Sequence, residues 1–190
     1  WAIDENMDTW GGVEDVTIQW CIIAEGSMEG HSKGVHSMGL LCGPRDASQR
    51  ISIHHNLFAN NNQRNPRFQG GRYEFVNNVV FNWGQIAGQL TWTPRANFIG
   101  NYYKPGESSR RDRYAVETDG PCPLYVEGNV SLRRPVGRLK AHGQDGRATP
   151  IDQWACVGQW DQPADQSLRR TEPWPPAPIP VSVQSAAEAV

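Results

Sequence analysis

The chain has 190 residues, a formal net charge of −2, 38% hydrophobic residues and 20% charged residues. These values are typical of a folded globular protein with one domain or at most two. No apolar run approaches the roughly 18 residues of a membrane span, and no segment has the pattern of a signal peptide, so we do not expect a membrane protein. The near-neutral charge also disfavours nucleic acid as a partner, because proteins that bind the phosphate backbone are usually strongly basic.

Five short segments share one pattern, in which apolar and polar residues alternate over the first positions and Asn or Cys stands at the sixth. Alternation with a period of two predicts β-strands. The segments start at residues 16, 51, 73, 96 and 124, so the starts are 35, 22, 23 and 28 residues apart. The segments are Val16–Cys21, Ile51–Asn56, Tyr73–Asn78, Ala96–Asn101 and Leu124–Asn129.

A strand that recurs about every 23 residues and ends each time at the same bend residue predicts an all-β fold, a right-handed, single-stranded parallel β-helix. Asparagine suits such a bend because it tolerates left-handed backbone angles and bonds to nearby backbone. Stacked bends then predict an asparagine ladder. A coil of about 23 residues fits roughly seven or eight times into the patterned part. The alternative is an antiparallel sandwich, which does not usually repeat one bend residue at one offset.

The chain is expected to divide at about residue 170. Residues 1–170 are predicted to form the β-helix domain without its N-terminal coils, because Trp1 already lies within a patterned stretch. Residues 171–190 are predicted to form a tail, since five prolines within Glu172–Pro180 favour an extended path along a surface. The order Ser185-Ala-Ala-Glu188 matches a capping box and predicts the start of a helix.

The strongest chemical signal is the segment Ile51–Gly71, ISIHHNLFANNNQRNPRFQGG. It resembles the HHN…R-x-P-x segment of the pectate lyase family (polysaccharide lyase family 1, pectin-lyase-like), whose members fold as right-handed β-helices. The pieces YEFVNNVVFNWG and NFIGNYYKPG extend the resemblance to about residue 106. The resemblance implies cleavage of polygalacturonate by β-elimination with Ca²⁺ as cofactor, an acidic polysaccharide (pectin) as partner, and a secreted, monomeric protein.

The resemblance also implies a role for individual arginines. The first Arg of the R-x-P-x motif is Arg64, which corresponds to the arginine that takes the C5 proton. A guanidinium is normally charged, so Arg64 acts as a base only if neighbouring cations lower its pKa, and otherwise acts as a charge clamp on the developing carboxylate anion. The family often has a second substrate-binding Arg five residues later, where this chain has Gln69. Arg67 is the candidate to compensate.

The family places its calcium-binding carboxylates in the segment that corresponds to residues 1–10, which makes Asp4, Glu5 and Asp8 the candidate metal ligands. Carboxylate oxygens suit a hard cation, but three acids do not fill six to eight positions, so substrate, water and further acids would have to contribute. In the loop from Gly30 to Ser37, the resemblance makes Lys33 the candidate contact for the substrate carboxylate, with His36 as a stand-in.

Two other functions are compatible with the predicted fold. The first is a non-catalytic β-helix that binds acidic polysaccharide, which Gln69 suggests. The second is a pectin hydrolase or esterase, which needs paired carboxylates on adjacent coils, whereas Glu74 and Glu127 lie about two coils apart. The four cysteines have no C-x-x-C spacing and predict no zinc site of the cysteine type, but Cys122 and Cys156 are candidates for a disulfide.

Overall fold

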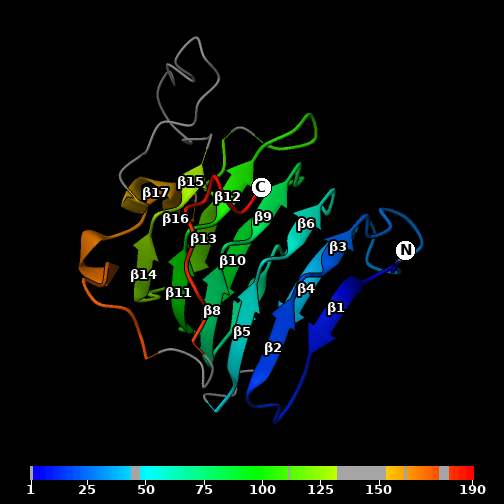
Figure 1. The fold of residues 1–190 in the computed structure, drawn as a ribbon. Coiled ribbons are helices and arrows are strands. Elements are labelled where there is room, and N and C mark those ends of the chain that lie inside the picture. The colour runs from blue at the N-terminus through cyan, green and yellow to red at the C-terminus, as the bar shows by residue number, and fades with distance from the viewer. Residues whose placement is uncertain (1, 44–47, 111, 132–152, 161, 176–179) are drawn as a thin grey trace.

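The computed structural model describes residues 2–43, 48–110, 112–131, 153–160, 162–175 and 180–190. In this part of the chain the regular structure is almost entirely β-strand, arranged in three sheets whose successive strands are parallel (Figure 1). Apart from one short antiparallel strand at the end of the first sheet, each sheet takes every third strand along the chain, so the chain winds through all three sheets in turn. The fold is the predicted all-β parallel β-helix.

We call the three sheets A, B and C. Sheet A consists of β1 (Glu5–Thr9), β4 (Met38–Cys42), β7 (Arg67–Gln69), β10 (Gly88–Thr91), β13 (Val116–Asp119), β16 (Val157–Gln159) and β17 (Gln162–Pro163). Sheet B consists of β2 (Val16–Gln19), β5 (Arg50–His54), β8 (Arg72–Val76), β11 (Arg95–Ile99) and β14 (Leu124–Glu127). Sheet C consists of β3 (Ile22–Ala24), β6 (Leu57–Ala59), β9 (Val79–Phe81), β12 (Tyr102–Lys104) and β15 (Val130–Ser131).

Five complete coils, from β1–β3 to β13–β15, lie in the described residues, and β16 begins a sixth. The expectation of seven or eight coils is wrong for this part of the chain, because loops of unequal length lie between the sheets. The loop from β3 to β4, for example, accounts for the spacing of 35 residues between the first two repeats. The short strand β17 pairs antiparallel with β16. Two 3₁₀ helices complete the regular structure, η1 (Gln153–Cys156) and η2 (Gln166–Leu168).

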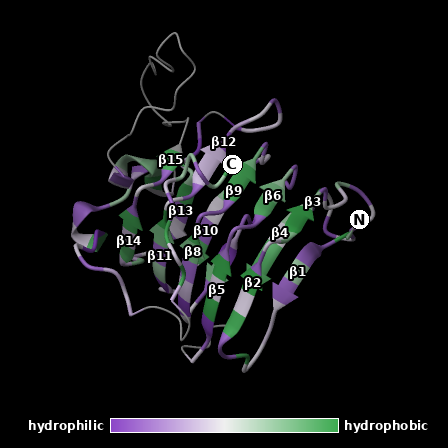
Figure 2. Cartoon of the chain, in the orientation of Figure 1, coloured by the Kyte–Doolittle hydropathy of each residue, from purple (hydrophilic) through white to green (hydrophobic). Residues whose placement is uncertain are grey.

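The core is built from apolar columns in which residues of successive coils stack in register. In sheet B, one column runs through all five strands, and its members are 0–7% exposed. Complete burial of a Phe or Ile side chain contributes roughly 1.5–3 kcal/mol, so these columns hold the coils together. Figure 2 shows the resulting hydrophobic bands on the strands. The column consists of Ile18, Ile53, Phe75, Phe98 and Val126.

The asparagine ladder is confirmed at the bends between sheets B and C. Asn56, Asn78, Asn101 and Asn129 are 0–4% exposed. Each side-chain amide donates to the Oδ1 of the next asparagine, at 2.9, 3.2 and 2.8 Å, and that same oxygen accepts the backbone N–H of the preceding asparagine. The side chain of Gln153 continues the ladder by accepting the Asn129 N–H at 2.7 Å. The ladder therefore links the coils through buried amides.

The described part of the C-terminal tail runs back across sheet B (Figure 1). The side chain of Asn97 bonds to both the N–H and the carbonyl of Trp174, and the side chain of Asn77 does the same to Gln184, at 2.8–3.0 Å. The predicted helix start at Ser185 is wrong for residues 185–190. The Glu188 carboxylate does accept the Ser185 N–H at 2.9 Å, but the residues form a single turn.

All four cysteines are free thiols, so the candidate disulfide between Cys122 and Cys156 is not formed. Both side chains are buried. Within the described residues, no helix has the length and apolar character needed to cross a bilayer.

Candidate functional site on sheet A

The outer face of sheet A carries a row of side chains from five coils, four of which are polar. Side chains alternate along each strand, and Leu40 and Phe68 point into the core. The residues next to them therefore face outward, and the parallel register aligns them in one row. Asp8 and Arg67 of this row are two strands apart, which corresponds to roughly 10 Å. The row consists of Asp8, Leu41, Arg67, Gln89 and Glu117.

Arg64 lies in the turn that leads into β7, with a φ of 60°. Its carbonyl accepts a 2.7 Å hydrogen bond from the Leu40 N–H, which fixes the turn against β4. Gly39 makes this close approach possible, because a Cβ at that position would lie 2.6 Å from the Arg64 carbonyl oxygen. Any larger residue at position 39 must therefore displace the turn that carries Arg64.

A network of buried side-chain amides, centred on Asn61, also holds this turn in place. The Asn61 side chain is 1% exposed and donates to the carbonyl of Ile23 at 2.8 Å and to Oδ1 of Asn65 at 3.0 Å. Its own Oδ1 accepts from the side chain of Asn6 at 2.9 Å and from the Gly26 N–H at 3.1 Å. The turn around Arg64 is thus tied to strands of the preceding coil. Apart from its place in an Asn-rich stretch, no sequence feature predicted this role for Asn61.

The surroundings of Arg64 affect its pKa in opposite directions. Burial and the neighbouring Arg67 guanidinium lower the pKa of Arg64, whereas the charge of Asp4 raises it. Arg64 also forms an ion pair with Glu5, whose side chain is 8% exposed, and this contact favours the charged guanidinium. Burial likewise lowers the pKa of Arg67, with Asp119 acting the opposite way. Within the described residues Arg67 has no ion-pair partner, and its Nε atom is buried without a hydrogen bond.

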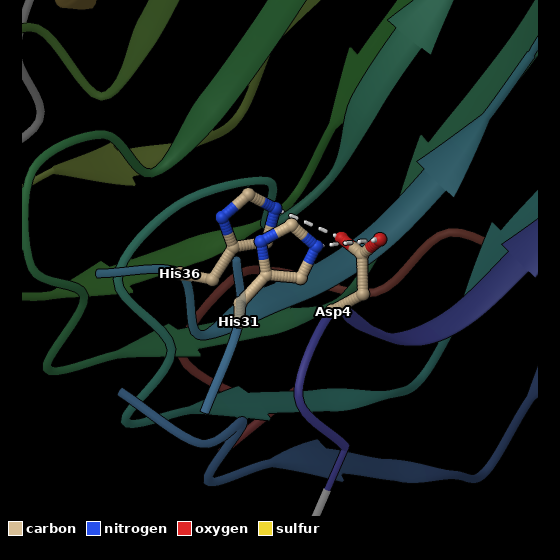
Figure 3. A group of neighbouring side chains, drawn as sticks. All are labelled: Asp4, His31 and His36. Carbon is tan, nitrogen blue, oxygen red and sulfur yellow. Dashed lines mark ion pairs between the residues drawn. The ribbon is translucent and has the colours of Figure 1, made fainter. Parts of the chain in front are cut away.

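The three acids predicted as calcium ligands do not converge. Glu5 is engaged by Arg64, and Asp8 is exposed on β1. The carboxylate of Asp4 instead contacts Nε2 of His36 at 2.9 Å and Nε2 of His31 at 3.6 Å (Figure 3). The described residues therefore form no oxygen cage of the six to eight ligands that calcium prefers.

The remaining predicted residues occupy different environments. Lys33 is exposed at the tip of the loop between β3 and β4, and its N–H donates to Nδ1 of His31 at 3.0 Å. His36 is 7% exposed and lies beside Asp4. Gln69 is 5% exposed. His31 was not among the residues singled out from the sequence, although it lies five positions before His36 in one glycine-containing loop.

The fold and the site thus define a parallel β-helix protein whose outer sheet A face carries two half-buried arginines. Comparison with known proteins gives no match to a family model. The chain is nevertheless homologous to several fungal proteins described as probable pectate lyase C. It is 39% identical over 113 residues to the protein of Aspergillus fumigatus, covering 57% of this chain and 24% of that protein.

Two further relatives extend the matched region. The probable pectate lyase C of Aspergillus flavus is 39% identical over 133 residues, covering 68% of this chain and 29% of that protein. That of Emericella nidulans is 36% identical over 129 residues, with 68% and 28% covered. The matched part of the chain thus spans only about a quarter of the length of these curated relatives.

Proposed function

We propose that this chain is the catalytic part of a polysaccharide lyase that cleaves polygalacturonate by β-elimination. The observation that carries the proposal is Arg67, a half-buried guanidinium with no ion-pair partner in the described residues, next to Arg64 on the outer face of sheet A. An unpaired, partly desolvated cation is costly for a folded protein, and an anionic ligand would satisfy it. The uronate carboxylate is such an anion, and the homology to probable pectate lyases supports this substrate.

The reaction requires removal of the C5 proton of a uronate and departure of the C4 oxygen. A water molecule takes up the C5 proton, the electron pair of the C5–H bond becomes the C4–C5 double bond, the C4–O bond breaks with its electron pair on oxygen, and that oxygen takes up a proton from water. Negative charge develops on the C6 carboxylate as C5 loses its proton. In this proposal Arg64 and Arg67 stabilise that charge through charge-assisted hydrogen bonds.

The ion pair with Glu5 supports a charge-clamp role for Arg64 over a role as the C5 base. A base must be deprotonated, and a neighbouring carboxylate holds the guanidinium in its charged form. Burial and Arg67 act in the other direction on the pKa of Arg64. The variant Arg64→Lys separates the two roles. A clamp loses most activity because Lys cannot bind a carboxylate in a bidentate manner, whereas a base keeps activity with a pH profile moved toward lower pH.

A calcium requirement stays a prediction. Asp4, Glu5 and Asp8 do not form a shared site in the described residues, so a calcium ion would need oxygen ligands from the substrate, from water or from outside these residues. The steps assigned above to Arg64 and Arg67 do not depend on it. A chelator added to the activity assay tests the requirement directly. The homology also supports a secreted protein that acts on an acidic polysaccharide, and we propose that it acts as a monomer.

The test is incubation with polygalacturonate, with and without Ca²⁺, followed by ultraviolet detection of 4,5-unsaturated ends. We expect product from the parent chain and its loss in Arg64→Ala. Arg50→Ala is the matched control, because Arg50 pairs with Asp15 at the start of a sheet B strand and should not affect activity. New reducing ends without unsaturation would instead identify a hydrolase. Binding without any product, unchanged by chelator, would identify a non-catalytic polysaccharide-binding protein.

A further inference from the structure

Three side chains at the start of β1 form a group that the proposed elimination does not use. The ligand atoms of Asp4, His31 and His36 all lie within 4.8 Å of one another. Figure 3 shows both imidazole rings directing a nitrogen toward the Asp4 carboxylate. We propose that these three residues bind a divalent transition-metal ion of the zinc type. The proposal stands on this geometry and does not depend on the lyase activity.

The distances between the donor atoms match a metal site. Two ligands bound to zinc at about 2.0–2.2 Å in a tetrahedral arrangement lie roughly 3.3–3.6 Å apart. Oδ2 of Asp4 lies 3.6 Å from Nε2 of His31, which is within this range, and Oδ1 of Asp4 lies 2.9 Å from Nε2 of His36, which is slightly shorter. The two rings stack with their centroids 3.8 Å apart and an interplanar angle of 10°, so both nitrogens approach from one side. Small rotations of the side chains would therefore admit an ion between the three donors.

The donor types select the metal. Imidazole nitrogen is a ligand for zinc and its transition-metal neighbours, whereas calcium takes six to eight oxygens. Two imidazoles and one carboxylate form a donor set of the zinc type. Three protein ligands also leave a fourth position for water or another small ligand. This site therefore differs from the calcium site that Asp4 was predicted to join.

The surroundings of the three side chains suit an ion that enters from solvent. The side chains of His36 and His31 are only 9% and 13% exposed, so their rings are held in place by packing. The Asp4 side chain is 49% exposed and leaves the site open on one side. A bound ion would tie the loop between β3 and β4 to the start of β1, next to the turn that carries Arg64.

One hydrogen bond must change when the metal binds. In the structure Nδ1 of His31 accepts the Lys33 N–H at 3.0 Å, so a neutral imidazole carries its proton on Nε2, facing Asp4. A metal on Nε2 requires the proton on Nδ1, and the Lys33 N–H must then turn away. Gly30 and Gly34, with φ values of 94° and 88°, flank this contact and allow the loop to rearrange. The amide of Lys33 thus reports on ligation by His31.

The experiment is calorimetric titration of the metal-stripped chain with ZnCl₂ and, separately, with CaCl₂, without polysaccharide. We expect one zinc ion to bind per chain and calcium to give no comparable binding. Asp4→Asn and His36→Gln should each weaken zinc binding by at least about tenfold, since even residues that only orient metal ligands contribute that much. Substitution of Co²⁺ for zinc should give the visible absorption of a tetrahedral site in the parent chain and lose it in both variants.

His54 and His55 provide the control, because their Nδ1 atoms lie 2.9 Å apart and form the other imidazole pair of the described chain. The double variant His54→Gln/His55→Gln should bind zinc like the parent. Absence of zinc binding in the parent, or a loss in this control as large as in Asp4→Asn, would overturn the proposal. If His36→Gln does not fold, Asp4→Asn still decides the matter, because its side chain is half exposed. An NMR signal of the Lys33 amide that does not move on zinc addition would rule out ligation by His31.

Discussion

Replacement of Arg67 by methionine should raise the stability of the fold and lower its affinity for an acidic oligosaccharide. The Arg67 guanidinium is half-buried, its Nε atom has no hydrogen-bond partner, and no ion pair compensates its charge within the described residues. An unsatisfied buried polar group costs about 1–3 kcal/mol, and methionine keeps most of the aliphatic packing. We therefore expect Arg67→Met to raise the free energy of unfolding by about 1 kcal/mol.

The same substitution should weaken binding of oligogalacturonide. A hydrogen bond to a charged group contributes about 1.5–3 kcal/mol, and each 1.4 kcal/mol corresponds to a factor of ten in affinity. The expected loss is therefore roughly 10-fold to 100-fold in Kd, measured by calorimetry. A residue whose removal stabilises the fold while it weakens ligand binding is maintained for function at the expense of stability.

Arg113→Met is the matched comparison, because Arg113 is an arginine of similar burial that does have a partner. It lies 3.2 Å from the Glu117 carboxylate, whose side chain is 8% exposed and whose pKa is raised chiefly by burial. Removal of one partner of a buried pair leaves an uncompensated charge, so we expect a loss of about 3 kcal/mol. Urea unfolding followed by tryptophan fluorescence measures both variants. A loss of more than 1 kcal/mol in Arg67→Met, or unchanged oligosaccharide affinity, would contradict the reasoning.

Three further outcomes follow from the same structure. Asn78→Ala should lower the free energy of unfolding by about 2–6 kcal/mol, because the N–H of Asn56 and a buried carbonyl lose their partners. The exposed control Gln85→Ala should change the free energy of unfolding by less than about 0.5 kcal/mol. Equal urea midpoints for the two variants would argue against the ladder as a source of stability. Gly39→Ala should reduce lyase activity with little change in secondary structure by circular dichroism, because its Cβ would collide with the turn that leads into β7. Burial raises the pKa of the Cys42 thiol to about 12, so iodoacetamide at mildly alkaline pH should modify that cysteine only after unfolding, and mass spectrometry that finds it labelled in the folded chain would refute this.

The strand pattern and the bend residues could be predicted because they are local properties. Alternation of apolar and polar residues determines which side of a strand is buried, and the five predicted repeats are the strands of sheet B together with their bends. The ladder followed from Asn at one offset, since stacked identical bends bring identical side chains together. The continuation by Gln153 was missed, because that residue belongs to no repeated segment.

The arrangement of the candidate site could be predicted only in part. The motif around Arg64 predicted Arg64 and Arg67 as candidates, and the structure places Arg67 on β7 of sheet A and Arg64 in the turn before it. The partners of each charge were not predictable, because they come from different coils and depend on loop paths. Glu5 was predicted to bind a metal and instead pairs with Arg64. Its neighbour in sequence, Asp4, contacts His31 and His36.

The sequence by itself determined the period of the coil, the inward and outward faces of the strands and the bend that stacks into a ladder. These features are encoded by neighbouring residues, through side-chain alternation and backbone preferences. Only the tertiary structure decided which charged groups meet. The contact between Asp4 and the two imidazoles of His31 and His36 joins the bend before β1 to the loop between β3 and β4, and the path of that loop, not the spacing along the chain, brings them together.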